Sequence, residues 1–374
     1  MNPGLVLGRV AGVRISVHWS WLIVFALIAW TLAAVVFPEQ NPGHSDAAYA
    51  AMAVAAAAAF FGALLLHELG HAAQARRESM EIEGITLWLF GGVATFRGQF
   101  PSALAELRIA LAGPLVTAAL ASVFGLTAAV GLPDVASGVV AWLAVMNLLL
   151  LGFNLLPALP LDGGRVLHAL VWRKTDDRRR ATSVGAGAGR VLGFVLIAGG
   201  LALVLGGAAG SGIWFAFLGW FLLQAATAEQ RDLALREALG DLRVEDLMVH
   251  RPVAAPADEP LGQFIDEVAH VHRFTTYPVV DHGKVVGLLP FARVAATPRD
   301  RWDDSTVRDC MLSLEESAVV QPRAPLLDAL AEMERRGRTR ALVLENGDLA
   351  GLLSITDVGR VMTEALETPK DGTR

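Results

Sequence analysis

The sequence predicts a polytopic α-helical membrane protein with six spans, followed by a soluble α/β module. Of its 374 residues, 54% are hydrophobic and only 18% are charged, which is too apolar for one soluble domain. The apolar runs stop near residue 230, and beyond that point a pattern recurs at an offset of about 64 residues, which is typical of a repeated α/β unit. We therefore expect a membrane domain over 1–230, a linker helix over 231–242, a tandem repeat over 243–366 and a tail over 367–374.

Composition excludes several classes of protein. The net charge of −6 and the lack of a basic block argue against a nucleic-acid partner. The one cysteine, Cys310, excludes an intrachain disulfide and fits a reducing compartment for the soluble half. The N-terminus lacks the charged region and small-residue cleavage site of a signal peptide. We expect the first apolar segment to remain in the mature protein.

The first hundred residues combine two spans with strand-like segments. Residues 4–17 alternate apolar and polar side chains, which predicts a short strand or hairpin at the membrane surface. Spans are predicted over 16–37 and 47–75. Residues 81–100 have strand composition interrupted by Gly91-Gly92, so we expect a hairpin beside the second span. Its open edge is a place where a substrate could pair.

Four further spans are predicted over 104–132, 139–164, 191–205 and 213–226. Gly113-Pro114 is expected to kink the first of these. The segment that ends in Asp162 contains Pro157 and Pro160, which cannot both continue a helix. Irregular backbone at membrane depth is tolerated where it is buried in protein or lines a polar cavity. Residues 165–190 are interpreted as a strongly basic loop.

The distribution of Lys and Arg predicts the orientation in the membrane. The short loops after the first, third and fifth spans contain neither residue. The opposite side carries Arg76, Arg77 and the cluster within 165–190. Because positive charge favours the cytoplasmic side, we expect a multi-pass protein of the cell membrane with both termini in the cytoplasm.

The second span carries the most specific motif, His67-Glu68-Leu69-Gly70-His71. On a helix, His67 and His71 lie one turn apart on the same face, so both imidazoles can bind one Zn²⁺. Glu68 lies beside them, where a carboxylate can take a proton from the attacking water and pass it to a leaving amine. Ionisable side chains in a span cost about 2.5–3.5 kcal/mol each, so their presence indicates function.

A catalytic zinc site needs a third protein ligand. Asp162 is the best candidate, because it ends an apolar segment on the same predicted side as the histidines and follows a broken backbone. A helix-terminating turn is the alternative role for this residue. Glu106 and His168 are weaker candidates, which we expect to face the headgroups or pair with nearby arginines.

The soluble half contains the repeat. Residues 244–248 (VEDLM) recur as 307–311 (VRDCM), and residues 277–289 recur as 341–353. Each copy has the pattern strand, helix, strand, glycine-containing turn, strand, helix. A small α/β module made twice is therefore expected.

These motifs resemble a known family. His67 to His71, followed by Asn154-Leu-Leu-Pro157-Ala-Leu-Pro160-Leu-Asp162-Gly-Gly at the end of another span, is similar to the site-2 protease family of intramembrane zinc metalloproteases. The paired repeats resemble cystathionine-β-synthase (CBS) domains. Their combination resembles the subgroup of the family that carries CBS domains, and the resemblance covers nearly the whole chain.

The resemblance implies a function and roles for individual residues. It implies one Zn²⁺ per chain held by His67, His71 and Asp162, with Glu68 as general base. Asn154 matches the family asparagine proposed to hold the substrate or its oxyanion, and Gly91 and Gly92 match the glycine pair of the strand that receives the unwound substrate. The implied substrate is a single-span membrane protein, such as an anti-sigma factor or a membrane-tethered pro-sigma factor. Its cleavage within the lipid bilayer would be regulated intramembrane proteolysis.

The resemblance to CBS domains implies an adenine nucleotide and a possible homodimer. In that family a Ser or Thr followed three residues later by Asp contacts the phosphate and ribose, and Ser354 and Asp357 fit this pattern in the second repeat. The first repeat departs from it, with Pro290 and Arg293 at the equivalent places. At most one nucleotide site per chain is expected.

Two rival functions follow from the same residues. A transporter or channel gated by CBS domains would explain polar groups at depth, but it gives Glu68 no role beside the histidines. A catalytically inactive homologue would bind single-span proteins without cutting them, and the complete set of two histidines, Glu68 and Asp162 argues against it.

Overall fold

The computed structural model describes residues 5–10, 12–88, 91–96, 98–240 and 242–367. These residues divide into two compact units, Met1–Gln230 and Arg231–Arg374. The expected tail beyond Glu367 lies outside the described residues. Each unit is treated by itself below.

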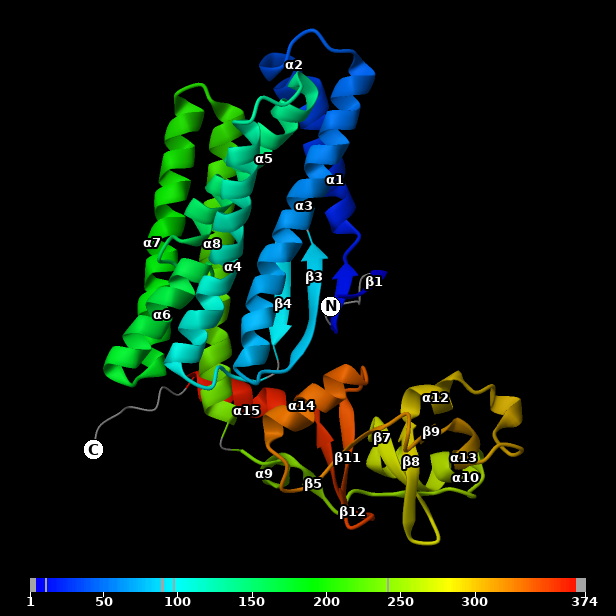
Figure 1. Cartoon of the computed structure of the whole chain (residues 1–374). Coiled ribbons are helices and arrows are strands. Elements are labelled where there is room, and N and C mark those ends of the chain that lie inside the picture. The colour runs from blue at the N-terminus through cyan, green and yellow to red at the C-terminus, as the bar shows by residue number, and fades with distance from the viewer. Residues whose placement is uncertain (1–4, 11, 89–90, 97, 241, 368–374) are drawn as a thin grey trace. The chain divides into compact units, whose positions relative to one another are not determined.

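The first unit is a helical membrane domain (Figure 1). Within the described residues, six helical segments are long and apolar enough to cross a membrane, which confirms the predicted number of spans. The first combines α1 (Ser20–Thr31), a π-helical turn (Leu32–Val36) and α2 (Phe37–Gln40). The others are α3 (Asp46–Arg77), α4 (Ala103–Ala128), α5 (Asp134–Asn154), α7 (Arg178–Leu205) and α8 (Ala209–Leu239).

Serine side chains begin two of the spans that carry the site. Ser45 Oγ accepts a hydrogen bond from the Ala48 N–H at the start of α3, and Ser102 Oγ accepts one from Ala105 at the start of α4. Such caps satisfy amides that have no partner within the helix. Both helices therefore begin at defined residues.

A four-stranded sheet lies beside α3 at one end of this unit (Figure 1). Its strands are β1 (Leu5–Val10), β2 (Val13–Val17), β3 (Ile82–Trp88) and β4 (Gly91–Phe96), in the order β1-β2-β3-β4. The predicted hairpins are both present, and they join through a parallel β2–β3 pairing. Strand β4 is at the edge of the sheet, and Ile85 of β3 packs with Val13 and Ala72 in a buried cluster that fixes the sheet against α3.

The prediction of a basic loop over 165–190 was wrong. This region forms α6 (Asp162–Thr175) and the first turns of α7. Asp176 in the left-handed conformation ends α6, and the Asp177 carboxylate caps α7 by accepting from the Arg180 N–H at 3.0 Å. The basic side chains are compatible with helices because aromatic surface and main-chain oxygens hold them. Arg178 stacks on Trp172 at 3.9 Å and donates to the Phe100 carbonyl.

The second unit contains two similar α/β halves, as the repeat predicted. The first half contains β6 (Ala255–Pro256), α10 (Leu261–Phe264) with a π-helical turn (Ile265–Ala269) and α11 (His270–His272), then β7 (Thr276–Asp281), β8 (Lys284–Pro290) and α12 (Phe291–Ala296). The second contains β10 (Ala318–Val320), α14 (Leu326–Arg335), β11 (Arg340–Glu345), β12 (Asp348–Ser354) and α15 (Ile355–Glu367). The short helix α9 (Val244–Leu247) precedes the first half, and η3 (Arg299–Arg301) and α13 (Val307–Cys310) lie between the two halves.

The two halves exchange strands. β9 (Leu312–Ser313), which opens the second repeat, pairs with β8 and completes the sheet β6-β7-β8-β9. β5 (Val249–His250), which opens the first repeat, pairs with β12 and completes the sheet β10-β11-β12-β5. Val285 and Leu288 of one half pack with Leu342 and Leu352 of the other. The repeats therefore share one interface and complete each other's sheets.

Candidate metal centre and active site

Three side chains from two helices converge inside the membrane domain. His67 and His71 lie on α3, and both are buried. Their Nε2 atoms are 3.1 Å apart. Asp162 Oδ2 lies 3.1 Å from His67 Nε2, and Oδ1 lies 3.2 Å from His71 Nε2. The structure therefore brings together the three residues that the sequence singled out as metal ligands.

The other nitrogen of each imidazole is bound by α4. His71 Nδ1 donates to the Ile109 carbonyl at 2.7 Å, and His67 Nδ1 lies 2.8 Å from Thr117 Oγ1. A carbonyl oxygen only accepts, so Nδ1 of His71 carries the proton and, in the neutral ring, Nε2 presents a lone pair. Hydrogen bonds of this kind orient the imidazoles of metal sites.

Asp162 is presented by a break between helices. Helix α5 ends at Asn154, residues 155–161 are irregular, and Asp162 is the first residue of α6. The next two residues leave no room for side chains: a Cβ at Gly163 would collide with the Leu155 carbonyl, and one at Gly164 with the Leu159 amide. Close backbone packing at these glycines holds the end of α6 against the irregular segment. The predicted break before Asp162 is therefore present.

The donor atoms fit a small tetrahedral cation. With Zn–N distances of about 2.0–2.1 Å, neighbouring ligands of tetrahedral zinc are about 3.3 Å apart. The three distances here are 3.1–3.2 Å. Oδ2 of Asp162 is buried and has no hydrogen-bond donor within the described part of the chain. A cation between these atoms would relieve the repulsion among their lone pairs.

Gly113 of α4 lies directly against the two imidazole rings of this cluster. A Cβ at this position would lie 2.7 Å from His67 Nε2 and would collide with His71 Nε2. Both imidazole rings therefore pack against a bare Cα. The sequence indicated Gly113 only as part of a Pro kink, because a motif does not show what lies opposite a glycine.

Glu68 faces β4. Its carboxylate accepts a hydrogen bond from the Ala94 backbone, and a Cβ on Gly92 would lie 2.5 Å from Glu68 Cγ. Gly91 has φ +128°, in the left-handed region that favours glycine. Gly92 thus lies directly against the side chain of the glutamate that the motif marked as general base, while Gly91 lies near Leu64. Asn154 is partly buried at the end of α5, and no hydrogen bond of its side chain occurs among the described residues.

The expectation that Glu106 and His168 face the headgroups was wrong. They bond to each other, with His168 Nδ1 2.8 Å from Glu106 Oε2, and Glu106 also interacts electrostatically with Arg178. The Glu106 side chain is only 3% exposed. The two residues are 62 positions apart and lie on different helices, so no local pattern could have paired them.

In the second unit, Ser354 and Asp357 lie at the junction of β12 and α15. Ser354 is buried and accepts from the Thr356 N–H at 3.3 Å, while Asp357 pairs with Arg360 at 2.9 Å. In the first repeat, Arg293 donates to the Met311 carbonyl at 2.8 Å. The guanidinium at that place is therefore engaged by the main chain of the second repeat.

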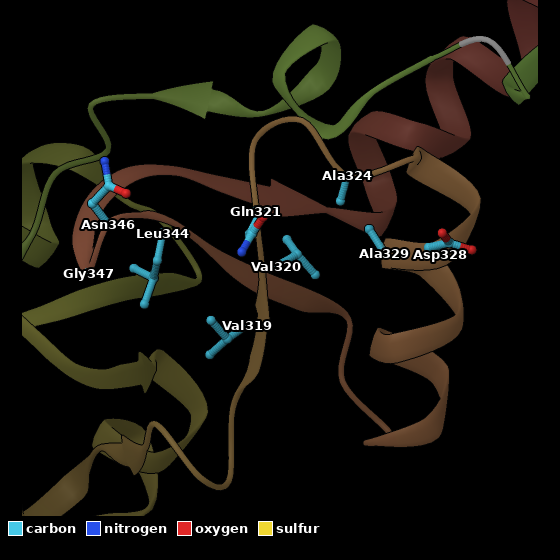
Figure 2. Close-up of a pocket in the computed structure, with 9 residues that line it drawn as sticks. All are labelled: Val319, Val320, Gln321, Ala324, Asp328, Ala329, Leu344, Asn346 and Gly347. Carbon is cyan, nitrogen blue, oxygen red and sulfur yellow. The ribbon is translucent and has the colours of Figure 1, made fainter.

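A cavity of about 540 Å³ occupies the opposite end of the β11–β12 hairpin (Figure 2). β12 has seven residues, so its two ends are about 20 Å apart. The cavity does not include Ser354 or Asp357, and sequence reasoning missed it. Its lining is Val319, Val320, Gln321, Ala324, Asp328, Ala329, Leu344, Asn346 and Gly347.

Comparison with known proteins extends over the whole chain. The model of peptidase family M50 matches residues 55–135 and 132–198, and the CBS domain model matches 244–295 and 307–364. Rip3 of Mycobacterium tuberculosis, named as a zinc metalloprotease, is 38% identical over 368 residues, which are 97% of this chain and 93% of Rip3.

An archaeal relative has the same extent. The zinc metalloprotease MJ0392 of Methanocaldococcus jannaschii is 29% identical over 379 residues, covering 99% of this chain and all of that protein. A solved structure of a site-2 protease from the same organism is 28% identical, with a TM-score of 0.42, and covers 60% of this chain and 94% of that chain. The chain therefore belongs to peptidase family M50, the site-2 proteases, as a multi-pass membrane zinc metalloendopeptidase with a C-terminal pair of CBS domains.

Proposed function

We propose that His67, His71 and Asp162 hold one catalytic zinc ion per chain. The observation that carries this proposal is the mutual approach of three side chains at 3.1–3.2 Å, with Asp162 Oδ2 toward His67 and Oδ1 toward His71, and with Nδ1 of His71 donating to a main-chain carbonyl. Zinc bound there would supply Lewis-acid activation of water and of the scissile carbonyl. Family membership supports zinc as the metal.

Glu68 is the general base and acid of the proposed reaction. Its carboxylate takes a proton from the attacking water and delivers it to the amine nitrogen of the leaving chain, so the residue ends in its starting state. Ala94 and Gly92 hold this carboxylate at the edge of β4. Asn154 supplies an amide that donates to the substrate carbonyl oxygen as charge develops on it.

The proposed substrate is the unwound membrane segment of a single-span protein, of the anti-sigma or pro-sigma factor type. A helical segment hides its amides in its own hydrogen bonds, so it must extend before it can be cut. Strand β4 is at the sheet edge, and Glu68 lies against it. An extended segment added to that edge would bring its peptide bonds to Glu68. The missing side chain of Gly92 leaves room for Glu68 to lie against the strand.

We also propose that both termini lie in the cytoplasm and that the CBS pair acts as a sensor. Ser354 and Asp357 would bind an adenine nucleotide, and the pair can also support a homodimer. A difference in nucleotide affinity between two arrangements of about 1–3 kcal/mol would change activity roughly 5- to 150-fold. The engaged guanidinium of Arg293 supports one nucleotide site per chain.

Glu68→Gln tests the assignment of catalytic roles. The variant keeps the shape of the side chain and the zinc ligands, so we expect zinc content per chain to stay at the wild-type level and cleavage of a single-span substrate to fall about 10²- to 10⁴-fold. Glu39→Gln, an exposed position on α2, is the matched control. Zinc loss from Glu68→Gln, or wild-type turnover by it, would contradict the assignment. A wild-type protein that binds substrate without cutting it would favour the inactive homologue.

A further inference from the structure

One face of α4 contacts the whole metal cluster. Glu106, Ile109, Gly113 and Thr117 are spaced by three, four and four residues, so they form a stripe along one side of the helix. Ile109 binds His71, Thr117 binds His67, and Gly113 lies under both rings. The first member, Glu106, has no contact with either histidine in the described structure and reaches α6 instead.

Glu106 takes part in a buried polar cluster that the proposed reaction does not use. Its Oε2 accepts from His168 Nδ1 at 2.8 Å, and His168 Nε2 lies 3.0 Å from Thr182 Oγ1. The Glu106 side chain is 3% exposed and Thr182 is also buried. The cluster therefore joins α4, α6 and α7 through hydrogen bonds among largely buried side chains.

His168 lies on the same short helix as the third proposed ligand. It follows Asp162 by six residues, about 9 Å along α6. The N-terminal end of α6 is packed without clearance at Gly163 and Gly164, and Asp162 and His168 lie on this one helix of 14 residues. A shift at His168 would be transmitted to the carboxylate.

We propose that Glu106, His168 and Thr182 are positioning residues that set Asp162 relative to His67 and His71. Helix α4 is then the common reference for all three ligands: it holds the two histidines directly and the aspartate through His168. The proposal rests on the proposed zinc site. The position of the Asp162 carboxylate matters because ligand distances in a metal site vary by only about 0.2 Å.

The test uses the purified full-length chain, with zinc affinity measured by competition with a chelator. His168→Leu leaves the Glu106 carboxylate buried and unpaired, so it should also lower thermal stability. The double variant Glu106→Leu/His168→Leu removes that unpaired charge. We expect the double variant to regain stability while its zinc dissociation constant stays about tenfold above wild type. Its kcat should fall with KM unchanged.

Two further variants separate the possible failures. Thr182→Val removes one hydrogen bond at constant shape, and should weaken zinc binding in the same direction even if the double variant does not fold. Leu170→Ala, at a half-exposed α6 position, is the control and should bind zinc like the wild type.

Asp162→Ala distinguishes this proposal from the zinc site on which it rests. If Asp162→Ala binds zinc as tightly as wild type, the ligand assignment itself fails. If Asp162→Ala loses zinc while the double variant, or Thr182→Val where the double does not fold, binds with wild-type affinity, the positioning role is overturned and the cluster only stabilises the fold.

Discussion

Replacing Gly113 by Ala tests the metal centre with one methyl group. The added Cβ would lie 2.7 Å from His67 Nε2 and closer still to His71 Nε2. Ordinary contact begins at about 3.4 Å, so His67 must retreat by about 0.7 Å and His71 by more. Both rings are also bonded to α4 through Thr117 and Ile109, so a retreat from Gly113 would strain these hydrogen bonds.

We expect Gly113→Ala to impair zinc binding and the reaction rate strongly and to change the stability of α4 little. A displacement of about 0.7 Å exceeds the tolerance of about 0.2 Å in metal–ligand distances, so both imidazoles cannot bind one ion. Misplacement on this scale costs about a hundredfold in rate. The helix itself should gain about 0.5–1 kcal/mol, because alanine is the better helix former.

Gly125→Ala is the matched control. It lies on the same helix, and a Cβ there meets no atom within 4 Å. Zinc per chain and cleavage of a single-span substrate are measured for both variants, together with helical content by circular dichroism. We expect Gly113→Ala to be folded, zinc-poor and inactive, and Gly125→Ala to match the wild type. A Gly113→Ala protein with a full zinc content and wild-type turnover would refute the geometry of the centre.

Three other perturbations have distinct outcomes. Gly92→Ala pushes against Glu68 Cγ and not against the ligands, so cleavage should fall by up to about a hundredfold while zinc content is retained; unchanged cleavage would show that the strand can retreat. Asp357→Ala should abolish binding of ATP, ADP and AMP to the full-length chain in calorimetry. If this variant binds them like the wild type, the nucleotide site is not at Asp357. A hydrogen bond from Arg308 holds the pKa of Asp281 below its ordinary value, so this pair stabilises the fold above about pH 4 and the contribution is lost as the pH falls through the lowered pKa. Arg308→Met should therefore lower the melting temperature at pH 6, and the difference from the wild type should shrink as the pH falls below about 4. Equal melting at pH 6 would contradict this.

Local patterns were sufficient to predict the spans and the proposed ligands. Apolar length predicts a span whatever its neighbours are, and the spacing of His67 and His71 on a helix leaves only one shared face. Asp162 could be selected because the prolines before it require a break in the helix. These inferences depend on residues close together in the sequence.

The parts that sequence did not predict depend on contacts between distant residues. Basic composition suggested a loop over 165–190, but cation–π stacking of Arg178 on Trp172 and a cap at Asp177 make helices there. The pairing of Glu106 with His168 joins helices far apart in the chain. Glu106 and His168 were expected at the surface because the sequence shows that they are ionisable, but it does not show that they bond to each other.

The exchange of β5 and β9 gives the CBS pair an interleaved order of connection. Leu239, the last residue of the final membrane helix, is buried in the core of the second repeat, together with Val244, Ala318 and Leu353. Ten residues further on, β5 pairs with β12, the strand that ends in Ser354. The segment that follows the last membrane helix therefore packs and pairs with the second repeat before the chain forms the rest of the first repeat.

Two consequences follow for cutting the chain and for transmitting force. Truncation after the first repeat would remove the core in which Leu239 is buried and the strand β9 that pairs with β8. Neither repeat can therefore be deleted without disrupting the other. Tension or rotation arising around Ser354 would reach the last membrane helix through one strand pairing and one hydrophobic core.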